Sequence, residues 1–230
     1  GNGLTESSPV IAVHPLEHPK LRTVGRPLSN VEVRIAEDGE ILARGESIMS
    51  GYYKDPAATA EAIDADRWLY TGDIGELDRD GYLRITDRKK HLFVSSGGKN
   101  IAPGPIEDLL LTSPLIDQIL LVGDDRPYIT ALIVPNYEAV VRVMNEQGIP
   151  TGNIKDKTVR EELSESDIVQ GLVDADIRRL QRELAAYERV RRFDLLAEEF
   201  SVENGMLTPT LKVKRKEVLK IFADLIEGMY

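Results

Sequence analysis

The stretch GYLRITDRKK, residues 81–90, marks the point where the sequence changes character. Its first half alternates apolar with polar side chains directly after the turn residues 78–81. This pattern predicts the second strand of a β-hairpin whose first strand lies at residues 75–77. Its second half is cationic and leads into mixed helical and strand patterns. We therefore place a domain boundary at Asp87.

The patterns before this stretch are those of strands and tight turns. An alternating segment, a polar turn and a second apolar segment over residues 31–44 predict another hairpin. Asp55 followed by Pro56 is typical of a helix start, and this helix is expected to end near Ile63. Residues 1–86 are thus expected to be rich in β-structure.

Beyond Asp87, apolar runs of strand length alternate with helical periodicity, as in a compact α+β or α/β domain. The longest helix is expected over residues 166–187, because apolar side chains from Ile177 to Tyr187 recur at helical spacing. The other expected elements are the strands 92–94, 116–122, 128–134 and 192–196 and the helices 103–111, 137–146 and 214–229.

The composition excludes several classes of protein. The 230 residues carry 29 Lys and Arg against 39 Asp and Glu, a net charge of −10, which argues against nucleic acid as the main partner. Apolar residues make up 42% and charged residues 30%, as in globular and not in disordered chains. The absence of cysteine excludes disulfides, a thiolate nucleophile and a zinc–thiolate site. No apolar run approaches membrane-spanning length.

Two polar motifs could bind a nucleotide. In GNGLTE, residues 1–6, the glycines permit close backbone approach, and Thr5 and Glu6 could hold a phosphate oxygen and Mg²⁺. In YTGD, residues 70–73, Asp73 could accept both hydrogen bonds of a ribose diol. The alternatives are a loop capped by the threonine and an Asx-turn that opens the next hairpin.

Two further motifs are basic. The run at residues 88–90 is followed by GGKN at 97–100, where the glycine pair beside Lys99 could line a narrow channel. Three adjacent cations are otherwise a solvated face. Residues 211–220 hold five basic side chains and one acid in an acidic chain. Because cations at a helix start oppose the macrodipole, these charges are either solvated or offset by an anion.

Taken together, GNGLTE, YTGD, ITDRKK…SSGGKN and NGMLTPTLKVKR resemble, in this order, the motifs of adenylate-forming enzymes, and most closely those of bacterial long-chain fatty acid–CoA ligases. The segments VGRPLSNVEVRI and ILARGESIMSGYY also look like this family. The resemblance implies an α+β chain. Residues 1–86 would be the C-terminal edge of a large AMP-binding domain, in a β-barrel-like subdomain, and residues 87–230 a mobile, mixed α/β C-terminal domain.

The resemblance also implies a reaction in two steps. A fatty carboxylate attacks the α-phosphorus of ATP, which gives acyl-adenylate and pyrophosphate, and the thiol of coenzyme A then displaces AMP. ATP, Mg²⁺ and coenzyme A are therefore the expected cofactor and co-substrates. The cationic segments at residues 88–90 and 212–216 are expected to face their phosphates.

Each motif residue takes a role from the family's pattern. Thr5 would contact phosphate, and Glu6 would bind Mg²⁺. Asp73 would hold the ribose hydroxyls, with Arg88 supporting the ribose or phosphate. Lys212 matches the adenylation lysine, which reaches the substrate carboxylate and the α-phosphate, and its loss is expected to remove only the first step.

The swing of the small domain between the two steps gives roles to four further residues. Asp87 matches the hinge of that movement. After the swing, Gly97, Gly98 and Lys99 would replace Lys212 at the site and line the channel for the pantetheine arm of coenzyme A.

Asn2 departs from the family's pattern, in which an aromatic residue stacks on adenine. Asparagine cannot stack comparably, which costs about 1–3 kcal/mol by analogy with base stacking elsewhere. Asn2 and Gly3 are nevertheless expected on the adenine side of the nucleotide.

No stretch resembles the phosphate loop TSGTTG-PKG of the family, and GNGLTE normally lies deep inside the full enzymes. We therefore expect the chain to be the C-terminal part of a longer protein and to form no adenylate by itself. Two alternatives are a relative that transfers its acyl group to a carrier protein, and a folded module without catalysis. The expected location is the cytoplasm, with peripheral membrane association because the substrate is a lipid.

Overall fold

The computed structural model describes residues 1–230, and the chain folds as two compact units. Unit 1 is Gly1–Leu92 and unit 2 is Phe93–Tyr230. The short segment after β6 is counted with unit 1, where Lys89 forms ion pairs with two carboxylates. The domain boundary expected at Asp87, which divides the chain into residues 1–86 and 87–230, stays a prediction.

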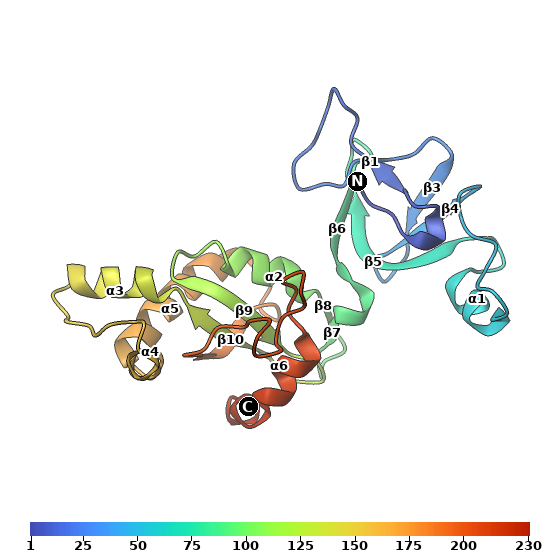
Figure 1. Ribbon diagram of the computed structural model, residues 1–230. Coiled ribbons are helices and arrows are strands. Elements are labelled where there is room, and N and C mark those ends of the chain that lie inside the picture. Colours follow the sequence, from blue (N-terminus) through green and yellow to red (C-terminus); the bar gives the residue numbers. More distant parts are fainter. The chain divides into compact units, whose positions relative to one another are not determined.

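Unit 1 is built on a curled, four-stranded antiparallel sheet (Figure 1). In spatial order its strands are β3 (Val31–Ile35), β4 (Glu40–Gly45), β5 (Leu69–Leu77) and β6 (Leu83–Arg88). Both hairpins expected from the sequence, β3–β4 and β5–β6, are confirmed. A separate antiparallel pair consists of β1 (Ala12–Val13) and β2 (Arg26–Pro27).

The helix of unit 1, α1 (Pro56–Ala62), begins and ends where the sequence predicts. Asp55 accepts a hydrogen bond from the backbone N–H of Ala58 at 2.9 Å, which satisfies one of the free donors of the first turn. Proline in that turn has no N–H to satisfy. The cap and the proline together fix this short helix.

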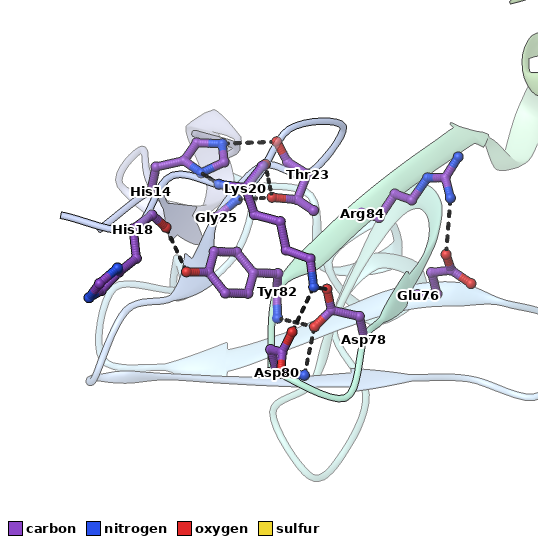
Figure 2. A network of polar contacts seen from close by, with 10 residues as sticks. All are labelled: His14, His18, Lys20, Thr23, Gly25, Glu76, Asp78, Asp80, Tyr82 and Arg84. Atoms are coloured by element: carbon purple, nitrogen blue, oxygen red, sulfur yellow. Dashed lines mark hydrogen bonds and ion pairs between the residues drawn. The ribbon is translucent and has the colours of Figure 1, made fainter. Parts of the chain in front are cut away.

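The loop before β2 is tied to the turn of the β5–β6 hairpin by a network around Lys20 and Tyr82 (Figure 2). Lys20 Nζ lies 2.7 Å from a carboxylate oxygen of Asp78 and of Asp80, and these bonds raise the pKa of Lys20 to about 12. The Tyr82 hydroxyl donates to the carbonyl of His18 at 2.6 Å. The turn end of the hairpin is therefore held in place by the loop between β1 and β2.

Unit 2 is built on a three-stranded mixed sheet. Its strands are β9 (Ile116–Val122), β10 (Ile129–Pro135) and β11 (Val190–Leu195). The central strand β10 pairs antiparallel with β9 and parallel with β11. A small hairpin, β7 (Phe93–Val94) and β8 (Asn100–Ile101), precedes the sheet in the chain.

Both faces of this sheet are buried. Alternate residues of each strand point to opposite faces and so contribute to two different cores. On β10, Ala131 and Ile133 belong to one apolar core, and Leu132 and Val134 belong to the other. The first core is covered by α2 (Pro103–Leu110), α3 (Tyr137–Glu146), α4 (Lys157–Ser164) and α5 (Asp167–Leu180). The second core is covered by α6 (Arg215–Ile221) and α7 (Ala223–Gly228). No helix is both long and apolar enough to cross a membrane.

The helix expected over residues 166–187 ends at Leu180, so its expected C-terminal end is wrong. A 3₁₀ turn, Gln181–Glu183, follows it. The buried side chain of Gln181 accepts from the N–H of Val190 at 3.0 Å and donates to its carbonyl at 3.3 Å. These two bonds turn the chain back toward β11, although the apolar spacing continues beyond the helix.

Asp194→Asn should stabilise unit 2 at neutral pH. Asp194 is half-buried on β11, and burial raises the pKa of its carboxyl. The stability that the Asp194 carboxyl contributes is therefore fully present below the unfolded pKa of about 3.9, where the carboxyl is protonated. It is lost as the pH rises through the higher folded pKa. Urea unfolding should show a gain on the order of 1 kcal/mol at pH 7 that vanishes below about pH 4.

The matched control is Asp117→Asn, because Asp117 is an exposed aspartate of the same sheet. A gain of equal size at pH 7 and in acid would contradict the role of burial at Asp194.

Candidate functional site

The predicted nucleotide-binding motifs of unit 1 meet around one cavity of about 510 Å³. It is formed by the opening motif, the start of β4, the segment before and at the end of α1, the start of β5 and the end of β6. Its lining residues are Gly3, Leu4, Thr5, Glu6, Glu40, Tyr52, Glu61, Ala62, Leu69, Tyr70, Thr71, Gly72 and Arg88. We call it the unit 1 cavity.

The opening motif reaches the cavity through a turn that only glycine permits. A Cβ atom on Gly3 would lie 1.6 Å from the carbonyl oxygen of Pro9. Thr5 and Glu6 follow in a 3₁₀ turn, Thr5–Ser7. Ser7 fixes this turn, since its hydroxyl donates to the carbonyl of Leu4 and accepts from its N–H, both at 2.9 Å.

Asn2 lies at the base of this turn and pairs with Ala12 through backbone hydrogen bonds. Its side-chain Nδ2 is buried and has no hydrogen-bond partner in the protein. An unpaired buried donor of this kind costs free energy unless a ligand or water accepts from it. Asn2 is absent from the cavity lining, and its expected place beside adenine stays a prediction.

Glu6 presents its carboxylate at the cavity with one oxygen engaged. The Tyr52 hydroxyl donates to Glu6 Oε1 at 2.9 Å, and this bond raises the pKa of Tyr52. Across residues 1–230, no group of three or more His, Cys, Asp or Glu side chains could enclose a metal ion. Magnesium does not need such a cage, because it is commonly held by one or two carboxylates, phosphate oxygens and water. Glu6 fits that donor set.

The Tyr70–Asp73 segment bulges out of the β4–β5 ladder. Leu42 pairs with Tyr70 and Glu40 with Ile74, so the three residues between Tyr70 and Ile74 oppose Ile41 alone. The Thr71 hydroxyl donates to the carbonyl of Ile41 at 2.7 Å. This bulge sets the turn that carries the candidate ribose ligand.

Asp73 is the last residue of the bulge and is 5% exposed. Burial raises the pKa of its carboxyl, and the Arg88 guanidinium opposes this shift. Arg88 Nε lies 3.3 Å from Asp73 Oδ1, and the two residues are direct partners in the β5–β6 ladder. Strand pairing thus brings together two residues that the sequence places in separate motifs.

Glu40 and Tyr52 line the cavity but were not recognised in the sequence. Glu40 is 3% exposed, and its carboxylate accepts from Lys89 Nζ at 2.7 Å. Lys89 also pairs with Asp38 at 2.7 Å, so this member of the cationic run already has carboxylate partners. A glutamate at the start of an apolar strand gives no sequence signal that it is buried. The position of Tyr52 after Gly51 gives no signal of its contact with Glu6.

The Gly97-Gly98-Lys99 segment of unit 2 forms the tight turn between β7 and β8. The carbonyl of Ser95 accepts from the backbone N–H of Gly98 at 2.7 Å. The hydroxyl of Ser95 accepts from the backbone N–H of Lys99 at 3.1 Å. Gly98 has a φ of +73°, and no other group would meet a Cβ atom there. The turn is exposed and offers open backbone, as a channel lining requires.

Lys212 is exposed on a loop of unit 2 between β11 and α6. Its backbone N–H donates to the Thr208 hydroxyl at 3.0 Å, and its carbonyl accepts from the Thr208 N–H at 2.8 Å. Leu211 takes the left-handed conformation, with a φ of +59°. This small closed loop presents the lysine side chain to solvent.

Arg215 belongs to the same basic segment but is an internal anchor. Its guanidinium donates to the Leu121 carbonyl at 2.6 Å and to Glu107 Oε1 at 2.5 Å. Glu107 also accepts from the backbone N–H of Leu121 at 2.8 Å. The expectation that the whole segment at residues 212–216 faces phosphate is therefore wrong for Arg215.

The expected hinge residue Asp87 lies near the end of unit 1. Its Oδ1 accepts from the backbone N–H of Arg88 at 2.6 Å and lies 3.5 Å from His91 Nδ1. The site residues expected in unit 1 are Asn2, Gly3, Thr5, Glu6, Asp73, Asp87 and Arg88, and those expected in unit 2 are Gly97, Gly98, Lys99 and Lys212.

A family model described as the AMP-binding enzyme C-terminal domain matches residues 90–230. The chain belongs to this family. Long-chain-fatty-acid–CoA ligase FadD15 of Mycobacterium bovis is 40% identical over 230 residues, which are 100% of this chain and 37% of the relative. Human long-chain-fatty-acid–CoA ligase 1 is 37% identical over 196 residues, 84% of this chain and 27% of the relative. The chain thus spans little more than a third of the bacterial relative's length.

Solved structures agree on the fold. The A-PCP didomain of carboxylic acid reductase from Segniliparus rugosus, in complex with AMP, matches 99% of this chain and 30% of its own, with a TM-score of 0.71 and 26% identity. O-succinylbenzoate coenzyme A synthetase from Bacillus subtilis matches 93% of this chain and 39% of its own, with a TM-score of 0.61 and 24% identity. The α+β adenylate-forming fold expected from the motifs is confirmed.

Proposed function

We propose that this chain is the C-terminal part of an ATP-dependent long-chain fatty acid–CoA ligase. The observation that carries the proposal is the unit 1 cavity, where Thr5, Glu6 and Arg88 meet beside Asp73. Identity of 40% over the whole chain to a long-chain-fatty-acid–CoA ligase supports the substrate class.

The ribonucleotide binds in the unit 1 cavity. Asp73, an acceptor at the end of the bulge, takes the hydrogen bonds of the ribose hydroxyls, as acidic residues do in other nucleotide folds. Arg88 supplies positive charge to the ribose or phosphate and balances the Asp73 carboxylate. Thr5 donates its hydroxyl to a phosphate oxygen.

Glu6 would hold Mg²⁺ together with the phosphates, and a bound Mg²⁺ would supply positive charge beside the α-phosphorus. Tyr52 keeps one carboxylate oxygen of Glu6 engaged and leaves Oε2 without a hydrogen bond inside the protein. That oxygen is the one available to the cation.

Lys212 acts in the first step, in which the fatty carboxylate attacks the α-phosphorus and pyrophosphate leaves. Its ammonium offsets the negative charge that accumulates there. The thiol of coenzyme A then attacks the acyl carbonyl and AMP leaves, with the Gly97-Gly98-Lys99 turn lining the approach. Asp87 is the proposed hinge between the two steps.

The second candidate is a relative that passes the acyl group to a carrier protein. The A-PCP didomain of a carboxylic acid reductase, which matches nearly the whole chain, favours including this acceptor in the test. We further propose a cytoplasmic location, with peripheral contact to the inner face of the membrane that would give access to the lipid substrate.

The test uses the full-length protein that carries this chain. With a long-chain fatty acid, ATP and Mg²⁺, it should catalyse ATP–pyrophosphate exchange and release AMP when coenzyme A is added. AMP release with a carrier protein and not with coenzyme A would replace the ligase proposal by the second candidate. Absence of exchange with any long-chain acid would reject both.

A further inference from the structure

Glu40 is a buried carboxylate of the unit 1 cavity whose two oxygens connect the bulge of β5 to the segment after β6. Oε1 accepts from the backbone N–H of Gly72 at 2.8 Å, and Oε2 accepts from Lys89 Nζ at 2.7 Å. A carboxylate that is 3% exposed is costly unless it is both paired and hydrogen-bonded, and here it is both.

The Gly72 bond repairs a gap in the sheet. Because Thr71, Gly72 and Asp73 bulge out opposite Ile41, the regular ladder is interrupted between β4 and β5. Gly72 is in the left-handed conformation with a φ of +71°, and no neighbouring group packs against its α-carbon within the reach of a Cβ atom. The Glu40 carboxylate is therefore a main support of the residue directly before Asp73.

The Lys89 bond supports the residue directly after Arg88. Gly72 is bonded covalently to Asp73, Asp73 pairs with Arg88, Arg88 is bonded covalently to Lys89, and Lys89 returns to Glu40. These contacts form a closed ring in which Glu40 joins Gly72 to Lys89. Removing Glu40 opens the ring on both sides of the Asp73–Arg88 pair at once.

We propose that Glu40 is a positioning residue that holds Asp73 and Arg88 in place for the ribose, and so sets the preference for ribonucleotides over 2′-deoxyribonucleotides. The inference rests on the proposed binding of the ribose hydroxyls by Asp73. Glu40 itself lies behind the Gly72 amide and acts through the two residues that it fixes.

The test compares ATP with 2′-deoxy-ATP in the full-length protein. Glu40→Ala should lower the ratio of kcat/KM for ATP to kcat/KM for 2′-deoxy-ATP by about tenfold. This is the effect of losing one charge-assisted hydrogen bond. Glu40→Gln, whose amide oxygen can still accept from Gly72, should recover part of this ratio. Calorimetric binding of AMP and 2′-deoxy-AMP should show the same change without turnover.

The matched control is Glu32→Ala, which removes an exposed glutamate of the same sheet that pairs with Arg44 at 2.7 Å. It should leave the ratio unchanged. If Glu40→Ala and Glu40→Gln weaken ATP and 2′-deoxy-ATP equally, Glu40 is merely structural and the inference is overturned.

Asp73→Asn separates this inference from the proposed function. If Asp73→Asn removes the preference and the Glu40 variants retain it, Asp73 binds the ribose and only the role of Glu40 fails. If Asp73→Asn retains the preference, the ribose assignment fails and the inference about Glu40 fails with it.

Discussion

Lys212→Ala in the full-length protein should lower ATP–pyrophosphate exchange by at least about 100-fold, the usual effect of removing one group that stabilises charge in the transition state. Lys212 is exposed, and its backbone contacts within the loop do not involve the side chain, so the substitution should leave the fold intact. Thioester formation from supplied acyl-adenylate should continue, because the thiol attacks the acyl carbonyl in that step and the α-phosphorus is not attacked.

The control for Lys212→Ala is Lys155→Ala, because Lys155 is an exposed lysine of the same unit outside the proposed site. It should retain full exchange. Lys212→Arg keeps a positive charge at the same position and tests whether a point charge is sufficient. Unchanged exchange in Lys212→Ala would show that this residue has been misassigned.

Gly3→Ala should strongly destabilise unit 1. The added Cβ atom would lie 1.6 Å from the carbonyl oxygen of Pro9 and 2.7 Å from Val10 Cα. Both contacts are with backbone, so no side-chain rotation relieves them and the Thr5–Ser7 turn must move. We expect a loss of about 2–4 kcal/mol in the free energy of unfolding, in the range of severe overpacking.

Nucleotide binding should fall together with stability in Gly3→Ala, since Thr5 and Glu6 move with the turn. Gly97→Ala is the matched control, because its Cβ atom would have only the Ser95 hydroxyl within 4 Å, at 3.9 Å. Chemical denaturation should place Gly97→Ala within about 0.5 kcal/mol of the natural protein. Equal stability of the two variants would contradict the clash at Gly3.

Local signals predicted the parts of the fold that depend on local chemistry. The Asp55-Pro56 helix start and the β3–β4 and β5–β6 hairpins follow from capping and alternation, and the structure confirms them. The C-terminal end of α5 was missed, because it depends on bonds between Gln181 and Val190, a partner that the periodicity of the helix does not reveal.

The candidate site likewise contains residues that local sequence signals predicted and residues that they did not. Thr5, Glu6 and Arg88 could be found because their motifs are contiguous in the sequence, and the structure brings them to one cavity. Glu40 could not, since its role depends on a bulge in the neighbouring strand, opposite Ile41. Lys89 and Arg215 looked like free cations in the sequence, yet each has a carboxylate partner distant in the chain.

The anchor at Arg215 limits how far Lys212 can travel by itself. Arg215 is held to Glu107 and to the Leu121 carbonyl, and Lys212 precedes it by three residues. Even a fully extended tether of that length spans only about 10 Å. Any longer excursion of the lysine must carry the sheet of unit 2 with it, so an excursion of that length would be a rigid-body movement and not a loop movement.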